Sequence, residues 1–107
     1  MAKSAGTHFA FRTNVAPYLI LTRDEIIERL NEIIVVPATR TIRGLPSEVI
    51  LTADDGMPAL CALNFDHVSL AQRERMGAVL CAFPESRWPE ARRALLVACG
   101  FVEQAAG

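Results

Sequence analysis

The sequence predicts a small, mainly β protein, in which an antiparallel sheet of short strands is followed by a C-terminal helix. Three observations lead to this fold class. The 107 residues are enough for one domain. Short apolar runs separated by turn residues occupy most of the chain. An apolar stripe at helical spacing occurs only near the C-terminal end. We therefore expect one domain over residues 1–107, with residues 1–7 as a loose end.

Seven segments are predicted to be strands, because each is an apolar or β-branched run bounded by turn residues. In chain order they are residues 8–11, 17–22, 33–36, 47–52, 59–64, 66–70 and 78–82. Pro17 is acceptable at the first position of its strand, where a missing N–H does least harm. The Ile-Ile-Val-Val run at 33–36 is typical of a buried central strand. Residues 54–58 are a strong turn signal.

Helices are predicted from local signals at three places. Thr22 and Glu25 form a capping-box pattern that predicts a short helix ending near residue 31. A helical turn is expected at 71–75. The clearest helix spans 84–100, with Gly100 as its C-terminal stop. Its apolar stripe consists of Trp88, Ala91, Leu95, Ala98 and Val102.

Composition excludes several classes of protein. A hydrophobic content of 51% and a net charge of −1 exclude a disordered chain. The apolar run from Ile33 to Ala38 is far shorter than the roughly 18–20 residues that span a membrane, and we find no secretion signal, so a cytoplasmic location is expected. The three cysteines lack a C-x-x-C pair, so we expect buried reduced thiols, no metal site and no cofactor.

Charge is distributed unevenly along the chain. Residues 1–43 hold six basic and four acidic side chains, whereas residues 44–72 hold four acidic ones and no base. Ten of the eleven bases are arginine, whose planar donor fork suits phosphates and carboxylates. The near-neutral total argues against a protein that is basic all over. Two interpretations remain open, a bias of surface composition and a local phosphate-binding cluster.

The polar loop at residues 39–46 is the leading candidate for a site. Thr39 and Thr41 face the same side of an extended segment. Together with the guanidinium groups of Arg40 and Arg43 and the flexible Gly44, their hydroxyls would form a phosphate cradle. The alternative is a solvated loop whose side chains satisfy the backbone of the turn.

Asp66, His67 and Ser69 have the residue types of a hydrolase triad. Adjacent residues of a strand point to opposite faces, so Asp66 cannot easily orient His67, and we do not expect a triad. His67 is either a surface histidine or an acid or base, because its ordinary pKa is near ~6.5. The acidic pair Asp54-Asp55 is explained by its turn.

Several stretches resemble the MazF/PemK family of toxin–antitoxin ribonucleases. Residues 17–23 read P-Y-L-I-L-T-R, and residues 35–49 read V-V-P-A-T-R-T-I-R-G-L-P-S-E-V. The N-F-D-H-V stretch at 64–68 and Met76-Gly77 also fit, and the resemblance covers about residues 9–102 in consistent order. It implies a small SH3-like antiparallel barrel of the MazF/CcdB type, with a C-terminal helix and assembly as a homodimer.

The resemblance also implies a function. It implies a toxin that cleaves single-stranded RNA, usually messenger RNA, at a short sequence and without a metal. The 2′-hydroxyl attacks the neighbouring phosphate, so the protein supplies positioning, proton transfer and charge stabilisation. The implied partner is a cognate MazE-like antitoxin with an acidic tail. The catalytic threonine maps to Thr39, and the RNA-binding positions map to Arg40, Thr41, Arg43, Asn64 and Asp66.

One position departs from the family pattern, because the catalytic Arg-Pro of the family is Ala16-Pro17 here. Alanine has no side-chain donor, and losing a transition-state donor typically costs about 10²–10³ in rate. We favour a toxin disarmed by substitution so that a host can produce it, then compensation by Arg12 or Arg40. A naturally inactive homologue is the third explanation. The alternative class is a non-catalytic member that binds an antitoxin or RNA, or acts on a gyrase-type target.

Overall fold

The computed structural model describes residues 8–10, 17–77 and 79–102. The predictions for residues 1–7, Arg12 and Ala16 lie outside these ranges. The strands are β1 (His8–Ala10), β2 (Tyr18–Ile20), β3 (Glu32–Thr39), β4 (Glu48–Leu51), β5 (Cys61–Asn64), β6 (Ser69–Gln72) and β7 (Val79–Ala82). The helices are α1 (Asp24–Ile27) and α2 (Trp88–Ala98), and the 3-10 turns are η1 (Ala53–Asp55), η2 (Phe65–His67), η3 (Arg73–Arg75) and η4 (Glu85–Arg87).

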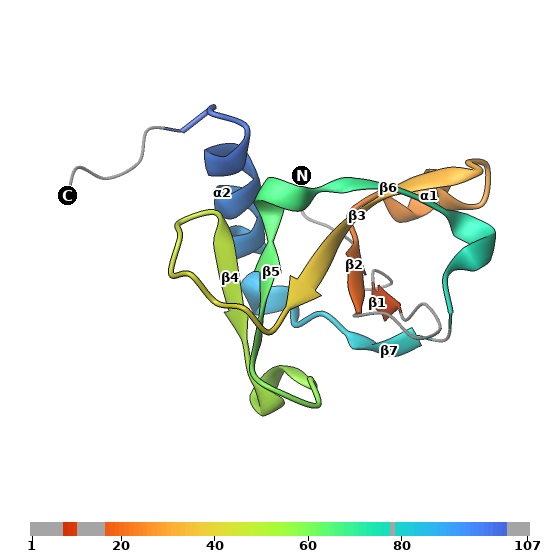
Figure 1. Cartoon of the computed structure of the whole chain (residues 1–107). Helices are drawn as coiled ribbons and strands as arrows, with labels where there is room; N and C mark the ends of the chain where they lie inside the picture. The colour runs from red at the N-terminus through yellow and green to blue at the C-terminus, as the bar shows by residue number, and fades with distance from the viewer. Residues whose placement is uncertain (1–7, 11–16, 78, 103–107) are drawn as a thin grey trace.

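Strand β3 is the longest strand and the centre of an antiparallel sheet (Figure 1). On one side it pairs with β2, where Leu19 lies opposite Val36. On its other side the first half pairs with β6, and the last two residues pair with β5. The remaining ladders extend the path to β4-β5-β3-β2-β1-β7. The predicted antiparallel sheet is therefore confirmed.

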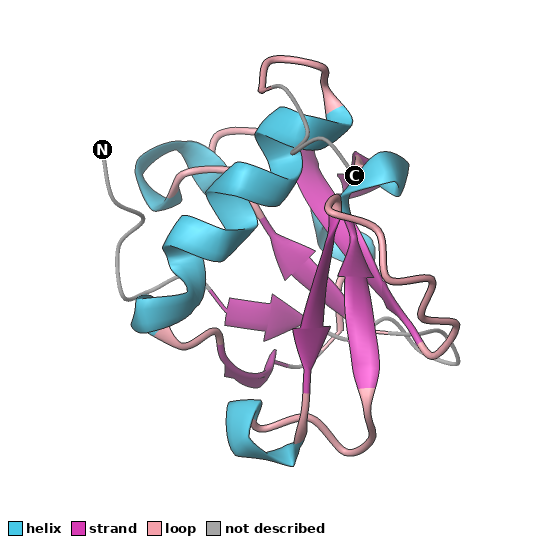
Figure 2. Cartoon of the chain, turned by 90° about the vertical axis from the view of Figure 1, so that its left-hand side faces the viewer, coloured by secondary structure: helices cyan, strands magenta, loops and turns pink. Residues whose placement is uncertain are grey.

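The sheet is not closed into the barrel that we expected. Within the described residues, the two end strands of the path, β4 and β7, do not pair with each other. Helix α2 packs against β4 and lies across one face of the sheet (Figure 2). The backbone edge of β4 is also engaged, because Arg87 Nη2 donates to the Ile50 carbonyl at 2.7 Å. This side-chain contact covers part of the exposed edge of the sheet.

Both faces of β3 are covered, which explains its β-branched sequence. Val36 belongs to the main core between the sheet and α2. Val35, on the other face, belongs to a smaller cluster with Ile33, against which Ile27 of α1 packs. Ile34 is the exception to the predicted burial, since it is 43% exposed. The main core contains Leu19, Val36, Val49, Leu51, Leu63, Phe65, Phe83, Trp88, Ala91 and Ala94, among others.

Thr22 does not cap a helix, contrary to the prediction. Helix α1 begins at Asp24, and its N-cap Arg23 makes no side-chain capping bond. The Thr22 side chain is buried, and its Oγ1 accepts the N–H of Ile34 at 2.7 Å. The hydroxyl therefore satisfies a backbone group of β3, which a capping pattern read along the sequence could not reveal.

Helix α2 is confirmed, with a later start than predicted. Its last turn closes at Gly100, whose φ of +78° is in the left-handed region. Gly100 N–H donates to the Val97 carbonyl and Phe101 N–H to the Leu96 carbonyl, which is the Schellman pattern. The buried residues of the helix are Trp88, Ala91, Ala94 and Val97. Leu95 and Ala98 of the predicted stripe are only partly buried against the core.

Candidate functional site

Thr39 is the last residue of β3 and lies beside the beginning of β2. The Pro17 carbonyl accepts the N–H of Ala38 at 3.0 Å, so the residue that follows Ala16 in sequence contacts the residue that precedes Thr39. Thr39 is half-buried, and its Oγ1 accepts the N–H of Thr41 at 3.1 Å. A hydroxyl that accepts through a lone pair still has its own proton to donate. Thr39 can therefore donate a hydrogen bond to a ligand oxygen.

Residues 40–46 form an exposed crossover loop. Strands β3 and β4 are both antiparallel to β5, so they run in the same direction on its two sides. The loop must return along the whole length of β5 to connect them (Figure 1). Every residue from 40 to 46 is exposed. Neither Arg40 nor Arg43 forms an ion pair with a described residue, so both guanidinium groups are available to an anion.

The backbone amides of this loop already bind an anionic group, the carboxylate of Glu48. Glu48 Oε1 accepts from the N–H groups of Arg43, Gly44 and Leu45, at 3.1, 2.8 and 3.2 Å. The two sequence interpretations of the loop thus apply to different parts of it. The amides are satisfied by a side chain of the chain itself, whereas the Arg40 and Arg43 side chains remain open. A phosphate would have to be bound by the side chains.

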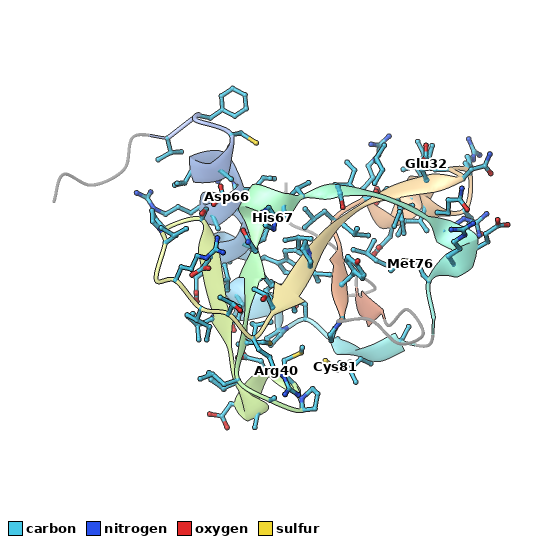
Figure 3. All side chains as sticks on the ribbon, in the orientation of Figure 1. Glu32, Arg40, Asp66, His67, Met76 and Cys81 are labelled. Atoms are coloured by element: carbon cyan, nitrogen blue, oxygen red, sulfur yellow. The ribbon has the colours of Figure 1, made fainter. Side chains whose placement is uncertain are left out.

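Asp66 and His67 lie at the opposite end of β5 from Arg40 (Figure 3). Both belong to η2, which Asn64 caps through Oδ1, the acceptor of the Asp66 N–H at 3.0 Å. This turn replaces the first residues of the strand predicted at 66–70. Asp66 Oδ2 accepts from Ser47 Oγ at 2.6 Å, and Asn64 Nδ2 lies 3.2 Å from His67 Nδ1. The six predicted site positions that the structure describes therefore do not form one cluster. Thr39 and Arg40 lie at one end of β5, and Asn64 and Asp66 lie at the other end, where the contact with Glu48 also places Arg43.

No triad forms from Asp66, His67 and Ser69 in these contacts. Asp66 bonds to Ser47 and His67 to Asn64. Nδ1 of His67 accepts from the Asn64 amide, so a neutral ring carries its proton on Nε2. His67 is exposed and lies at the opposite end of β5 from Arg40.

The thiols differ in burial, and two of them have shifted pKa values. Burial raises the pKa of Cys61, with Arg40 opposing the shift and Asp55 adding to it. Burial, with Asp55, also raises the pKa of Cys81. Thiols with raised pKa values are poor nucleophiles. The predicted burial holds for Cys61, but Cys81 is half-buried and Cys99 is exposed.

Arg87 and Asp55 form an ion pair that the sequence analysis missed. The distance from Arg87 Nη1 to Asp55 Oδ1 is 2.8 Å. Asp55 also accepts the Thr52 N–H, and Thr52 Oγ1 accepts the Asp54 N–H, as part of a capping box around η1. The T-x-x-D pattern of residues 52–55 was the available signal, although nothing local pointed to Arg87.

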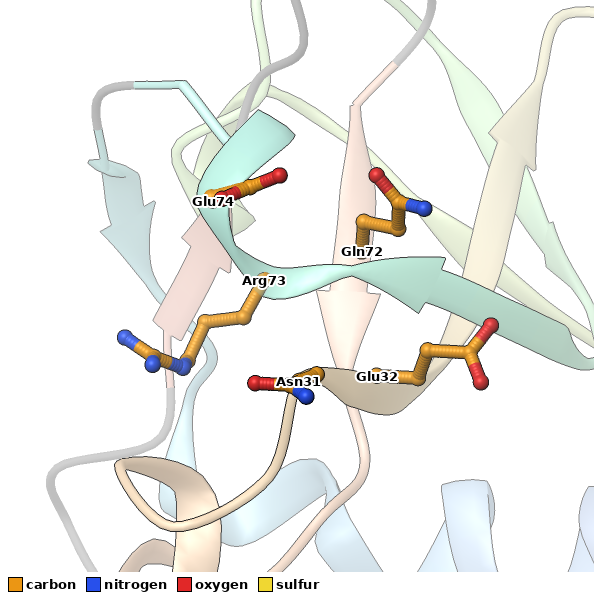
Figure 4. A pocket seen from close by; sticks show the side chains of 5 residues that line it. All are labelled: Asn31, Glu32, Gln72, Arg73 and Glu74. Atoms are coloured by element: carbon orange, nitrogen blue, oxygen red, sulfur yellow. The ribbon is translucent and has the colours of Figure 1, made fainter.

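A polar depression of about 560 Å³ lies elsewhere on the molecule, at the beginning of β3 and the end of β6 (Figure 4). Its lining residues are Asn31, Glu32, Gln72, Arg73 and Glu74, all of them exposed. None of the predicted site residues lines it. Among the residues that the structure describes, no group of three or more His, Cys, Asp or Glu side chains is placed to hold a metal ion. The described helices are too short and polar to cross a membrane.

Comparison with known proteins assigns the family. No family model matches the chain. It is 36% identical over 85 residues to the probable endoribonuclease MazF2 of Mycobacterium tuberculosis, covering 78% of this chain and 83% of that protein. The solved Mycobacterium tuberculosis toxin MazF-mt6 superposes with a TM-score of 0.80 at 27% identity, covering 91% of this chain and 98% of that one.

A complex of MazE and MazF from Deinococcus radiodurans shares the fold, with a TM-score of 0.73, 24% identity and coverage of 95% of this chain and 100% of that one. The similarity to MazF2 extends over most of both chains, including the central strand and the crossover loop. The fold of this chain is also the fold of solved MazF toxins. The chain therefore belongs to the MazF family.

Proposed function

We propose that this protein is the toxin of a toxin–antitoxin pair and that it cleaves single-stranded RNA in the cytoplasm. The observation that carries the proposal is the position of Thr39, which ends β3 directly beside the Pro17 segment. Arg40 and Arg43 follow on the exposed loop without ion pairs to described residues. MazF2, at 36% identity, is a probable endoribonuclease.

Thr39 and Arg40 would act on the phosphate at the cleavage position, whereas Arg43, held beside Glu48 at the Asn64 end of β5, would bind a phosphate farther along the RNA. In this reaction the 2′-hydroxyl attacks the adjacent phosphorus, the bond to the 5′-oxygen breaks, and negative charge accumulates on the phosphoryl oxygens. The Thr39 hydroxyl would donate to one of these oxygens, and the Arg40 guanidinium would stabilise the charge. Thr41 holds Thr39 through its N–H. The protein needs no nucleophile of its own, which agrees with the raised thiol pKa values of Cys61 and Cys81.

Asp66 and Asn64 would serve nucleotides farther along the RNA, because they lie at the other end of β5 from Arg40. Asp66 is exposed, and a carboxylate can accept a hydrogen bond from the amino group of a base. Asn64 is 7% exposed and bonds to the Asp66 backbone and the His67 ring. We therefore assign direct contact to Asp66, and assign to Asn64 the task of holding the η2 turn.

We also propose that the protein forms a homodimer and binds an antitoxin. The MazF chain from Deinococcus radiodurans shares this fold and is solved together with MazE. An antitoxin with an acidic tail would be complementary to the guanidinium groups of Arg40 and Arg43, which form no ion pair with the described residues and are also the groups proposed to bind RNA. Binding of the tail would then compete with RNA for the same charges.

Ala16 supports a second candidate function, that of a family member that binds RNA or an antitoxin without cleaving RNA. A chain that lacks the donor at this position would keep its binding surface but lose transition-state stabilisation. The two candidates differ in what happens when an arginine is introduced there.

The test is the substitution Ala16→Arg, compared with Ala16→Gln as an uncharged control of comparable length. If the chain is a disarmed toxin, induction of the Arg variant arrests growth, and the purified variant cleaves total RNA in the presence of EDTA. The original chain and the Gln variant should do so at most weakly. If the Arg variant causes no arrest and leaves all RNA intact, the endoribonuclease proposal fails and the binding function is favoured.

A further inference from the structure

The carboxylate of Glu48 lies in a concave set of backbone amides from the crossover loop. Its Oε1 is 2.8 Å from Gly44 N, 3.1 Å from Arg43 N and 3.2 Å from Leu45 N. Its second oxygen lies 3.3 Å from Arg43 N. Successive amides that converge on one point form an anion-binding nest, and here the anion is supplied by the chain itself.

The same residue also holds the loop through its backbone. Glu48 N–H donates to the Leu45 carbonyl at 2.9 Å, so the side chain and main chain of Glu48 close one turn together. Gly44 has φ of +72°, which allows the bend, and a Cβ there would meet nothing within 4 Å. Residues 40–46 are all exposed and belong to neither core cluster. The conformation of the loop near Arg43 therefore depends on hydrogen bonds to Glu48.

Glu48 binds Arg43 through its backbone and not through its guanidinium. The two side chains form no ion pair, although the carboxylate is hydrogen-bonded to the Arg43 N–H. The backbone of Arg43 is thereby held in place while its charged group stays available. This arrangement fixes where a cation is presented on a loop without neutralising it.

We infer that Glu48 is a positioning residue for RNA binding, acting through Arg43. It shapes the loop so that the Arg43 guanidinium meets an RNA phosphate. This inference rests on the proposed function, since it assumes that the loop binds single-stranded RNA.

A positioning role and a purely electrostatic role of Glu48 predict opposite effects on RNA binding when its carboxylate is neutralised. Glu48 is a negative group near the proposed path of an anionic ligand, so its neutralisation should tighten RNA binding if only its charge mattered. If it positions Arg43, the same neutralisation should weaken binding, because a carboxamide cannot accept equally from three N–H groups with its own amino group beside them. The sign of the change therefore distinguishes the two roles.

The experiment measures binding of a short, fluorescein-labelled, 2′-O-methylated single-stranded RNA of random sequence by fluorescence anisotropy at several salt concentrations. The 2′-O-methyl groups prevent cleavage during the measurement. The variants are Glu48→Gln, Glu48→Asp, Arg43→Ala and the double variant Glu48→Gln/Arg43→Ala. Glu85→Gln is the matched control, because Glu85 is exposed and its neutralisation changes the net charge equally. Amide hydrogen exchange at Gly44 reports the loop directly.

We expect Glu48→Gln to weaken binding about fivefold and to lower the salt slope by about 0.7, as for the loss of one single-strand phosphate contact. Glu48→Asp, which keeps the charge but moves it, should weaken binding too. Arg43→Ala should have the same effect, and the double variant should lose no more than either single variant, because the two act as one unit. Exchange at Gly44 should accelerate in both Glu48 variants.

Three outcomes would overturn the inference, and they differ in what they say about the proposed function. If the original chain binds RNA and Glu48→Gln binds it as tightly or more tightly, only the positioning role fails. Additive losses in the double variant would likewise separate Glu48 from Arg43 and reject the role. If the original chain does not bind the RNA at all, the proposed function fails together with the inference.

Discussion

Asp55 and Arg87 are 32 positions apart in the sequence, and their side chains meet with Oδ1 2.8 Å from Nη1. The same guanidinium donates to the Ile50 carbonyl at 2.7 Å and to Glu90 at 2.7 Å, and Asp55 accepts the Thr52 N–H at 2.9 Å. The two side chains are only 22% and 10% exposed, for Arg87 and Asp55 respectively. This ion pair therefore ties the connection between β4 and β5 to the start of α2.

Replacing Arg87 with Met should lower the free energy of unfolding by about 2 kcal/mol, because hydrogen bonds to charged groups contribute about 1.5–3 kcal/mol when partly buried. Urea unfolding at neutral pH measures the change. Arg92→Met is the control, since Arg92 is exposed on α2 and forms no ion pair with a described residue. Equal losses in the two variants would show that the ion pair adds no stability.

The stability that Asp55 contributes should disappear in acid. Burial raises its pKa, but hydrogen bonds from Thr52 and Arg87 and the charge of Arg87 outweigh burial, so the pKa lies below its usual 3.8. A lowered folded-state pKa stabilises the protein at pH values above about 4, and this contribution is lost as the pH falls through the folded-state value. The difference in unfolding free energy between the original chain and Asp55→Asn should therefore shrink below pH 4. In the Arg87→Met background the difference should be smaller at neutral pH, because Arg87 no longer offsets the burial of Asp55 while the Thr52 hydrogen bond remains.

Gly56→Ala should destabilise the protein more than Gly44→Ala does. Both glycines have positive φ, +88° and +72°, so each alanine carries a backbone penalty of about 1–2 kcal/mol. At Gly56 the added Cβ would also lie 3.1 Å from Cys81 Sγ, whereas at Gly44 nothing lies within 4 Å. Thermal unfolding measures both. Cys81→Ala removes the sulfur and should reduce the extra loss at Gly56. An unchanged loss would assign it to the backbone or to Cys81 Cβ, which would lie 3.3 Å from the added Cβ.

Thr39→Ala, made in the Ala16→Arg protein, should reduce kcat/KM for RNA cleavage about 10²–10³-fold, the usual cost of losing one donor to a transition-state oxyanion. The proposed dimer and the unfolding midpoint should not change, as gel filtration and thermal unfolding would show. Thr39→Ser keeps the hydroxyl and should retain most of the activity. Equal rates for the Ala and Ser variants would remove the hydroxyl from the mechanism.

Much of the fold could be predicted from local pattern. The Ile-Ile-Val-Val run identified β3, and Gly100 marked the end of α2. The predictions failed where a side chain has a distant partner. Thr22 bonds to Ile34 instead of capping α1. The segment at Asp66 is a 3-10 turn capped by Asn64, although its composition suited a strand.

The candidate site, like the fold, was predictable only where local sequence pattern determines it. The stretch around Thr39 could be proposed as a site from sequence, because its residue order resembles the pattern of the family. The binding of the Glu48 carboxylate to the loop amides could not be predicted, because in the sequence Glu48 has the pattern of an ordinary strand residue. The contact forms only when the loop folds back onto it. The separation of Asp66 from Arg40 also depends on the path of β5, which the order of residues along the chain does not reveal.

Residue order alone was sufficient for the fold class, the long helix and the family, because periodicity and motif spacing are properties of neighbouring residues. The open edge of the sheet, the Arg87–Asp55 ion pair and the occupied amide nest at Gly44 were decided only in three dimensions. The ion pair and the nest each join groups that local sequence pattern does not link, and the sheet edge depends on which strands meet, so all three arise only when the chain has folded.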